Sequence, residues 1–508
     1  MKNVKNTSEI LVRGSEKGHC TCDGTRDVIL PDHYGDIKKI LRATGTVSSS
    51  RANIDRSGVG FECRLLVTLL FIDESDLVKT FDTSLDIVGN CPIDQPTQDM
   101  SLISTSQVES VSVKAVNPRK IGIKASVGFD FKIWSTLDTL PQMPPFFDSG
   151  TLASVEKQCE PCLYTLLAEL CDQGIHASRE LELDKNMPSV GEILSFSLTP
   201  EKVDLSCGVR SIDCSTEIAA ELIYLSDDRQ VCCMQKKIPI TVTLDSDKVT
   251  SETAAIGVCS ISSSECRPIE NMTGQYRAIS VELKCDITVY AATAAEAEYV
   301  TDIYSTDFRT ECERQTVKYS SLASLEKVSA RRKISSPVDS DGSFEILSVK
   351  GSSVVTSFSD KDDGRYCYVL STVTVILKGA DGSVSSIGIP DGFEVCLPKS
   401  GEEICISLFE LDNAEISDGD LSVSYSAELT LLCWENRSID IVRKLQACET
   451  DRIVQGRPLT VYYPAPGETL WQVAKRYSIA SDLLEAANHD RDVGEALIIP
   501  RRRAVEGA

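Results

Sequence analysis

The amino-acid sequence repeats itself at a constant spacing of 153 residues. An Ile-Leu pair stands at Ile40-Leu41, at Ile193-Leu194 and at Ile346-Leu347, so 193 − 40 and 346 − 193 are both 153. Phe71 and Tyr224 keep the same separation. A chain of 508 residues is too long for one hydrophobic core. A fixed period of this length therefore predicts three copies of one domain in series.

Within each copy, apolar and polar residues alternate along the chain. Segments 61–71, 216–225 and 368–378 follow the three Ile-Leu pairs at similar distances. Longer alternations close the copies at residues 121–131, 279–289 and 421–431. Alternation places one face of a strand on a core and the other in water. The sequence thus predicts a mainly β protein with three tandem β-sandwich or open-barrel units, and one short helix in the first unit over residues 36–42.

Charge and hydropathy limit the partners. The formal net charge of -24 and the pI near 4.7 oppose binding to a phosphate backbone, so we expect no nucleic-acid partner. The first residues lack the apolar segment of a signal peptide, and no apolar run reaches the roughly 20 residues of a membrane span. We expect no membrane insertion and a cytoplasmic location. The 20 cysteines are expected to be reduced and packed, with later oxidative cross-linking in a mature shell as the alternative.

Candidate catalytic and metal-binding motifs are few and isolated. Cys159-Glu160-Pro161-Cys162 has the spacing of a zinc or redox pair, but a structural zinc site needs four ligands and no second such pair stands nearby. His19-Cys20-Thr21-Cys22 and Cys232-Cys233 are weaker candidates. The four histidines are spread over separate units, which disfavours a nucleophilic triad. We expect a protein that is not an enzyme and that has no catalytic residue, metal or cofactor.

Residues 26–47, RDVILPDHYGDIKKILRATGTV, resemble the opening of a SPOCS domain, a module of spore-coat and spore-morphogenesis proteins in endospore-forming bacteria. The resemblance is carried by Pro31-Asp32, Asp36-Ile37 and Ile40-Leu41. The second and third copies lack the Pro-Asp pair, so their assignment depends on the 153-residue offset.

Residues 300–313, VTDIYSTDFRTECE, resemble the junction between adjacent SPOCS copies, where an Asp-x-Tyr-Ser sequence is frequent. Here that sequence is Asp302, Tyr304 and Ser305.

The sequence from residue 459, LTVYYPAPGETLWQVAKRYSIASDLLEAAN, with the closing LIIP, resembles a LysM module. The pattern predicts a strand over 460–463, a helix over 469–477 with Thr469 as its N-cap, a second helix over 481–487 and a closing strand at 497–500. Trp471 and Tyr477 are expected to fill the small core.

In the LysM family, N-acetylglucosamine chains lie between the loop before the first helix and the loop after the second. By motif match these loops are Pro466, Gly467, Glu468, Thr469 and Leu470, and Asn488, His489, Asp490 and Arg491. The second loop is shorter than is usual in the family and carries charges in place of apolar residues. This departure favours a protein ligand over a glycan, and both alternatives remain open.

These observations predict SPOCS-like domains at 1–147, 148–300 and 301–448, a linker at 449–457 and a LysM domain at 458–504. Serial SPOCS domains with a terminal LysM module are the arrangement of spore-coat morphogenesis proteins. The resemblance implies a scaffold on the mother-cell side of the forespore surface that contacts other coat proteins, including a coat-basement ATPase. The alternative function is binding of peptidoglycan or chito-oligosaccharide in the cortex or wall.

Overall fold

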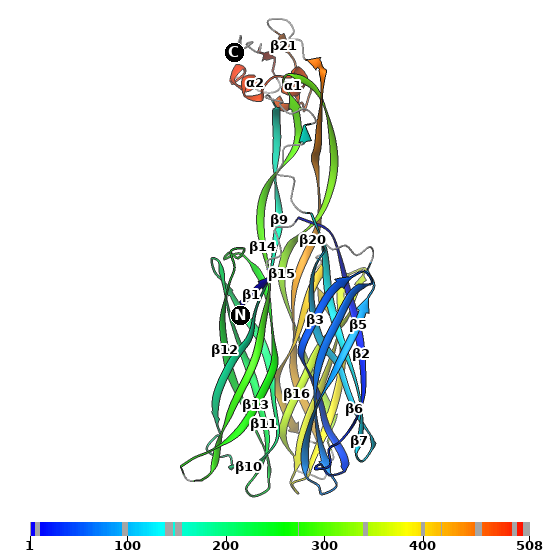
Figure 1. The fold of residues 1–508 in the computed structure, drawn as a ribbon, viewed down its shortest axis with the longest axis vertical. Coiled ribbons are helices and arrows are strands. Elements are labelled where there is room, and N and C mark those ends of the chain that lie inside the picture. The colour runs from blue at the N-terminus through cyan, green and yellow to red at the C-terminus, as the bar shows by residue number, and fades with distance from the viewer. Residues whose placement is uncertain are drawn as a thin grey trace.

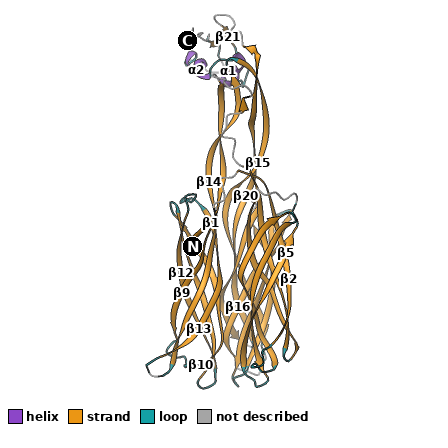
Figure 2. Ribbon diagram, viewed as in Figure 1, coloured by secondary structure: helices purple, strands orange, loops and turns teal. Residues whose placement is uncertain are grey.

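The structure is a computed structural model, and it describes residues 2–5, 11–93, 100–137, 146–147, 155–272, 274–338, 344–397, 402–417, 419–452, 460–489 and 495–500. Figure 2 shows that strands make up almost all of the described chain and that helices occur at one end only. The prediction of a mainly β protein is confirmed.

Six long strands form each of three units, which have the same strand order. The first unit contains β2 (Leu11–Ile29), β3 (Ile37–Asp55), β4 (Gly58–Asp73), β5 (Val78–Cys91), β6 (Met100–Asn117) and β7 (Lys120–Leu137). The second contains β9 (Val155–Glu182), β10 (Val190–Cys207), β11 (Ser211–Ser226), β12 (Val231–Asp245), β13 (Ala254–Glu270) and β14 (Tyr276–Ser305). The third contains β15 (Phe308–Pro337), β16 (Phe344–Lys361), β17 (Gly364–Gly379), β18 (Val384–Leu397), β19 (Glu402–Ser417) and β20 (Asp420–Arg452).

In each unit two antiparallel three-stranded sheets pack face to face. One sheet has the order β3-β4-β5, β10-β11-β12 or β16-β17-β18. The other has the order β2-β7-β6, β9-β14-β13 or β15-β20-β19, and the short strand β1 (Lys2–Lys5) adds to the outer edge of β9. The short strand β8 (Phe146–Phe147) pairs with β20.

The alternating residues of the sequence form the cores. The inward positions of β7 between Ile121 and Phe131 are all buried, and so are those of β14 between Ile279 and Val289. The same face of β20 is buried in the third unit. Each of these faces packs on the central strand of the opposite sheet. Every second side chain of a strand lies on the same side, so the alternating apolar residues form one continuous buried face. Local alternation therefore determines which face of each sheet is inside.

Residues 37–42 form the start of β3, so the helix predicted over residues 36–42 is wrong; Asp36 precedes the strand. Ile40 pairs with Phe71 across the sheet, and Ile193 and Ile346 occupy the matching places opposite Tyr224 and Leu377. Apolar residues at 37, 40 and 41 fit a helical stripe, but register shifts after Ile37 and Ile40 show irregular strand pairing that disturbs strict alternation. This irregularity made the segment look helical.

The three units form a ring around a common axis. β5 of the first unit contacts β10 of the second, β12 contacts β16 of the third, and β18 contacts β3 of the first. Because the same pair of strand positions meets at all three interfaces, the contacts are head-to-tail and the ring closes within one chain. Figure 1 shows the three strand bundles side by side and parallel to the long axis of the molecule.

Residues 153 apart meet on this axis. They form one buried apolar cluster made of three sets of equivalent residues. The sets are Leu41, Leu194 and Leu347; Leu70, Ile223 and Ile376; and Val78, Val231 and Val384. The leucines of the three Ile-Leu pairs thus contribute to the contact between units, whereas the isoleucines pack against the cores of their own units. The sequence pattern alone does not reveal this division.

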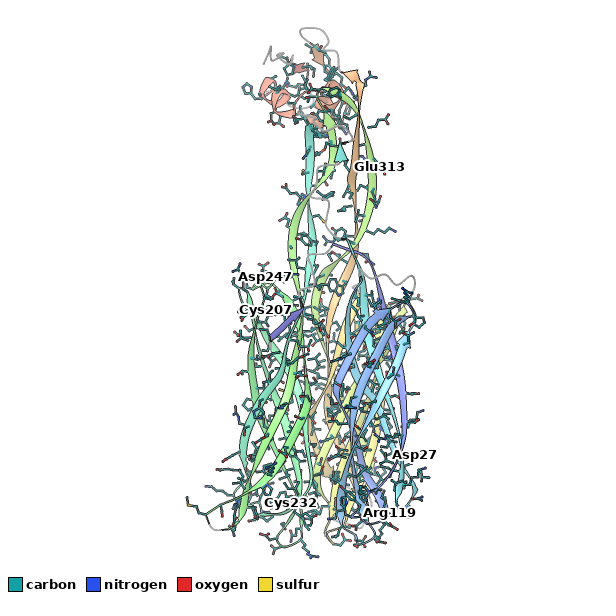
Figure 3. All side chains as sticks on the ribbon, in the orientation of Figure 1. Asp27, Arg119, Cys207, Cys232, Asp247 and Glu313 are labelled. Atoms are coloured by element: carbon teal, nitrogen blue, oxygen red, sulfur yellow. The ribbon has the colours of Figure 1, made fainter. Side chains whose placement is uncertain are left out.

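Four strands continue beyond the units as a stalk, which consists of residues 155–166, 293–305, 308–321 and 435–452 (Figure 1). Glu313, labelled in Figure 3, lies in the third of these segments. Within the stalk, β14 pairs with β9 and β15 pairs with β20. Small apolar clusters hold the two pairs together, and one contains Cys162, Tyr299, Val317, Tyr319 and Ile441. The predicted boundaries at 300 and 448 fall inside β14 and β20, so these strands run on without interruption.

The tip module, residues 460–489 and 495–500, sits at the end of the stalk. It contains β21 (Thr460–Tyr462), α1 (Leu470–Tyr477), α2 (Ser481–Ala487) and β22 (Leu497–Ile499). β21 and β22 pair antiparallel. The predicted helices and strands of this segment therefore lie where the sequence places them. Neither helix of the described chain is long and apolar enough to cross a membrane.

Candidate binding surface at the tip

The tip module owes its shape to local capping and a small core. Thr469 is the N-cap of α1, as predicted: its side chain accepts a hydrogen bond from the backbone N–H of Gln472, and the Gln472 side chain accepts one from Thr469 N–H. This reciprocal arrangement satisfies two donors that a helix start would leave free. Val473 and Ala474 are fully buried and face Leu484 of α2.

The module is seated on the junction between β14 and β15. Trp471 Nε1 donates to Asp302 Oδ2 at 2.8 Å, and Lys475 Nζ donates to Asp302 Oδ1 at 2.6 Å. Arg314 of β15 also reaches Asp302 Oδ1, at 2.9 Å. The Tyr304 hydroxyl donates to the Ile479 carbonyl oxygen at 2.7 Å. One carboxylate and one hydroxyl of the stalk thus hold α1 and the turn that follows it.

Aromatic packing accompanies these bonds. The rings of Tyr304 and Trp471 meet edge to face with centroids 5.0 Å apart, a favoured geometry for aromatic pairs. Tyr304 is buried in the core of the tip module. Trp471 therefore joins the stalk to the module as well as packing on the module's own core, where the sequence predicted only the second role.

The Asp302 carboxylate is held ionised. Burial by itself would raise its pKa, but the hydrogen bonds from Lys475 and Trp471 outweigh burial and hold the pKa of Asp302 below its usual range. Burial raises the pKa of Tyr304, so its hydroxyl stays protonated and able to donate. The Asp302 carboxylate therefore places one negative charge against the side of α1 that carries Lys475.

Most of the predicted groove residues in the first loop serve the module itself. Glu468 is buried, and its Oε2 accepts from the Tyr462 hydroxyl at 2.8 Å and from Ala465 N–H at 2.9 Å. Its Oε1 pairs with Arg476 at 2.7 Å. Thr469 caps the helix and Leu470 packs on the core.

Only Pro466 and Gly467 of this loop are exposed without an internal role of that kind. Gly467 has a φ of +83° at the turn, a conformation that glycine adopts without strain. An added Cβ at Gly467 would meet nothing within 4 Å, so the backbone here is open to a ligand.

The second predicted loop also contains one buried residue that bonds within the module and one exposed residue. Asn488 is buried, and its side chain accepts from Ile498 N–H at 2.7 Å and donates to the Ile498 carbonyl at 2.8 Å, so it joins α2 to β22. His489 is exposed. Asp490 and Arg491 lie outside the described residues.

One exposed aromatic side chain was missed by the sequence reading. Tyr463 follows β21, precedes the loop at Pro464, and is 75% exposed. Val461, two residues earlier, is 51% exposed. The signal was present in the sequence, since Tyr462 and Tyr463 are adjacent and a strand can bury only one of them. Asp302 belongs to the Asp-x-Tyr-Ser sequence, but its contact with Trp471 joins residues 169 positions apart, which no local pattern predicts.

The two cysteines of the Cys159–Cys162 motif do not converge. Cys159 is exposed and Cys162 is buried, with its thiol donating to the Tyr319 hydroxyl at 3.2 Å. The two lie on one strand three residues apart and so face opposite sides. Among the described residues there is no group of three His, Cys, Asp or Glu side chains that could hold a metal ion. Every cysteine whose side chain the structure describes is a free thiol.

His19 lies in an ion-pair cluster of the first unit. Its Nδ1 is 2.9 Å from Asp130 Oδ1 and its Nε2 is 3.0 Å from Glu109 Oε1. The hydrogen bonds to Asp130 and Glu109 raise the pKa of His19 to about 10. An imidazole with its pKa raised in this way is protonated near neutral pH, and its ion pairs with the two carboxylates join β2, β6 and β7.

A cavity of about 1360 Å³ lies between the units and is lined by residues of all three. Its walls carry many hydroxyl groups, such as those of Thr44, Ser197 and Ser352, together with apolar side chains.

Comparison of the chain with models of protein families, with curated proteins and with solved structures finds no match.

Proposed function

We propose that this protein is a non-enzymatic scaffold of endospore coat assembly, in which three SPOCS-like units carry a LysM-like module that binds a coat protein. The observation that carries the proposal is the placement of the tip module. It is fastened to the end of a stalk by Asp302 and Tyr304, while Tyr463, Pro466 and Gly467 remain exposed. A binding loop presented on a rigid support is what an adaptor needs.

The chemistry of the exposed loop favours a protein partner. Recognition of a sugar uses a small number of precisely placed polar groups, from side chains or from the backbone. Glu468 and Asn488, which could supply such groups, are buried and occupied within the module. An exposed tyrosine next to an open backbone turn is typical of a protein interface, where aromatic residues dominate the binding energy. The coat-basement ATPase implied by the family resemblance is the partner we propose.

A second candidate is a peptidoglycan-binding protein that uses the same loop. Tyr463 supports it, because an exposed aromatic ring can stack on the apolar face of a sugar. Calorimetry of the full chain with chitohexaose separates the two candidates. We expect no binding tighter than the millimolar range, whereas micromolar binding that is lost in Tyr463→Ala supports the glycan reading.

The scaffold proposal is tested in sporulating cells of an endospore former that carries this gene. A fluorescent fusion of the full chain should form a ring around the forespore, and Tyr463→Ala should weaken that ring. Val88→Ala, which removes a 73% exposed side chain from β5 of the first unit, is the matched control and should leave it unchanged. Diffuse fluorescence of the unaltered fusion, with normal coat attachment in a deletion strain, contradicts the proposal.

A further inference from the structure

A buried charged cluster lies beside the apolar axis and draws one charged residue from each unit. This axial cluster consists of Arg42 of β3, Glu221 of β11, and Ser348 and Lys350 of β16. Arg42 Nη2 is 2.7 Å from Glu221 Oε1, and Arg42 Nη1 donates to Ser348 Oγ at 2.7 Å. Ser348 donates in turn to Glu221 Oε2 at 2.6 Å. Lys350 Nζ lies 3.6 Å from Glu221 Oε1 and donates to Ser197 of β10.

The cluster is buried and charged. The exposed fractions of the Arg42 and Glu221 side chains are 4% and 7%, and that of the Lys350 side chain is 19%. Burial by itself would raise the pKa of Glu221, but Lys350 and Arg42 outweigh it and the pKa is lowered, so the carboxylate stays ionised. A buried ion cluster of this kind is weak evidence for stability, because desolvation of the ions offsets their attraction, and its best-attested use is to specify one arrangement.

The equivalent positions in the three units carry different residues. Where the first unit has Arg42, the others have serine at 195 and 348, each 153 residues further on. Where the second unit has Glu221, the others have threonine at 68 and 374. Where the third unit has Lys350, the others have Thr44 and Ser197. The surrounding apolar cluster has leucine, isoleucine or valine at all of its positions and cannot distinguish one unit from another.

Any other arrangement of units separates these charges. In a ring with the first unit followed by the third, Arg42 would face threonine in place of Glu221. A ring with two copies of one unit would bring two buried charges of the same sign to the axis. Both cases leave a desolvated charge without its partner, which is more costly than a neutral contact.

We propose that the axial cluster is a specificity element: its charges meet their partners only when the three units follow one another in the cyclic order first, second, third. The surfaces that it matches belong to different units of the same chain. Specificity arises here from the penalty on wrong neighbours as much as from the bonds to the right one.

An ion pair at the interface of the first and second units can report the order of the units in the ring. Lys79 Nζ of β5 is 2.7 Å from Glu192 Oε1 of β10. The third unit has Glu345 at the position equivalent to Glu192. A zero-length carbodiimide cross-linker joins a lysine to a carboxylate that touches it. It should therefore join Lys79 to Glu192 in the correct ring, and to Glu345 when the third unit takes the place of the second.

The test uses the full chain with Arg42→Met, Glu221→Leu and Lys350→Met together, which removes the charges and keeps the volume. After unfolding and refolding, the unaltered chain should give the Lys79–Glu192 product alone and elute as a monomer. The triple variant should give Lys79–Glu345 as at least a tenth of the Lys79 product, together with oligomers detected by light scattering.

Arg64→Met with Asp86→Leu removes an exposed ion pair of the first unit and should leave the cross-links unchanged. If the triple variant does not fold, Glu221→Gln carries the same test, because it leaves Arg42 and Lys350 without their carboxylate. A folded triple or single variant that remains monomeric and gives only Lys79–Glu192 overturns the proposal.

Discussion

At the scale of single residues, buried charges do two different tasks in this protein. Arg42 and Glu221 meet on the axis between units, whereas Asp302 receives Trp471 and Lys475 at the seat of the tip module. In both places a carboxylate is kept ionised by neighbouring donors against the effect of burial. Such residues are sensitive to substitution because the removal of one partner leaves the others desolvated and unpaired.

Replacement of Asp302 by asparagine is predicted to release the tip module from the stalk. Asparagine keeps an acceptor for Trp471 but loses the charge that holds Lys475 and Arg314. We expect the docking free energy to fall by about 2 kcal/mol, or roughly 30-fold in the docking equilibrium. Fluorine NMR of chains labelled with fluorotryptophan reports on docking directly, since the chain has 3 tryptophans and Trp471→Phe assigns the signal.

The same contact should depend on pH. The folded pKa of Asp302 lies below the unfolded value of about 3.9. Its contribution is therefore complete above that unfolded value and is lost as the pH falls through the lower folded pKa. We expect the Trp471 signal to shift below pH 4 in the unaltered chain and in the control Asp86→Asn. A Trp471 signal in Asp302→Asn that matches the unaltered chain at every pH contradicts this role.

At the scale of elements, the two sheets of each unit approach closely at the strands that face the axis. Gly351 of β16 lies under the ring of Phe409 of β19, where an added Cβ would be 2.2 Å from the Phe409 Cζ atom. The Phe409 ring stacks in turn on Tyr425, with centroids 4.8 Å apart. A side chain at 351 must therefore displace an aromatic ring that is already packed.

Gly351→Ala is predicted to destabilise the protein by about 1–3 kcal/mol, since the core has no space for the extra methyl group. Gly388→Ala in β18 is the matched control, because an added Cβ there meets nothing within 4 Å and the position is exposed. The control should change stability by about 0.5 kcal/mol or less. Denaturant unfolding measures both. Equal midpoints for the two variants would show that the Phe409 ring moves freely.

At the scale of the whole molecule, the axial cluster of apolar residues couples the three units. Ile223 is 1% exposed and contacts the matching residues of the other two units in one cluster. Ile238 is equally buried but belongs to the core of the second unit alone. The two isoleucines lie on neighbouring strands of one sheet, so they separate coupling between units from loss of stability within a unit.

Ile223→Ala and Ile238→Ala should each cost about 2–5 kcal/mol through the lost contacts and the cavity. Hydrogen exchange measured by mass spectrometry distinguishes them. In Ile223→Ala we expect faster exchange in β4 and β17 as well as in β11, because the cavity opens onto all three units. In Ile238→Ala the increase should remain within the second unit. Unchanged exchange in β4 and β17 of Ile223→Ala would mean that the units open independently.

The sequence could predict elements whose pattern is local. Alternation identified the buried faces of β7, β14 and β20, and the helical stripe with Thr469 located α1. It failed at residues 37–42, where irregular pairing in β3 disturbs the alternation. In the candidate site the motif match named two loops, and whether they bind a ligand stays a prediction. The sequence could not tell that the Glu468 and Asn488 side chains bond within the module, since packing decides their partners.

By itself the sequence determined the strand periodicity, the 153-residue offset and the elements of the tip module, because these depend on neighbours a few residues apart or on simple counting. Only the tertiary structure decided that the units close into a ring, that Arg42 meets Glu221, and that Asp302 seats Trp471. Such contacts join residues more than 150 positions apart. They depend on how folded surfaces fit together, and no local preference of the chain encodes that fit.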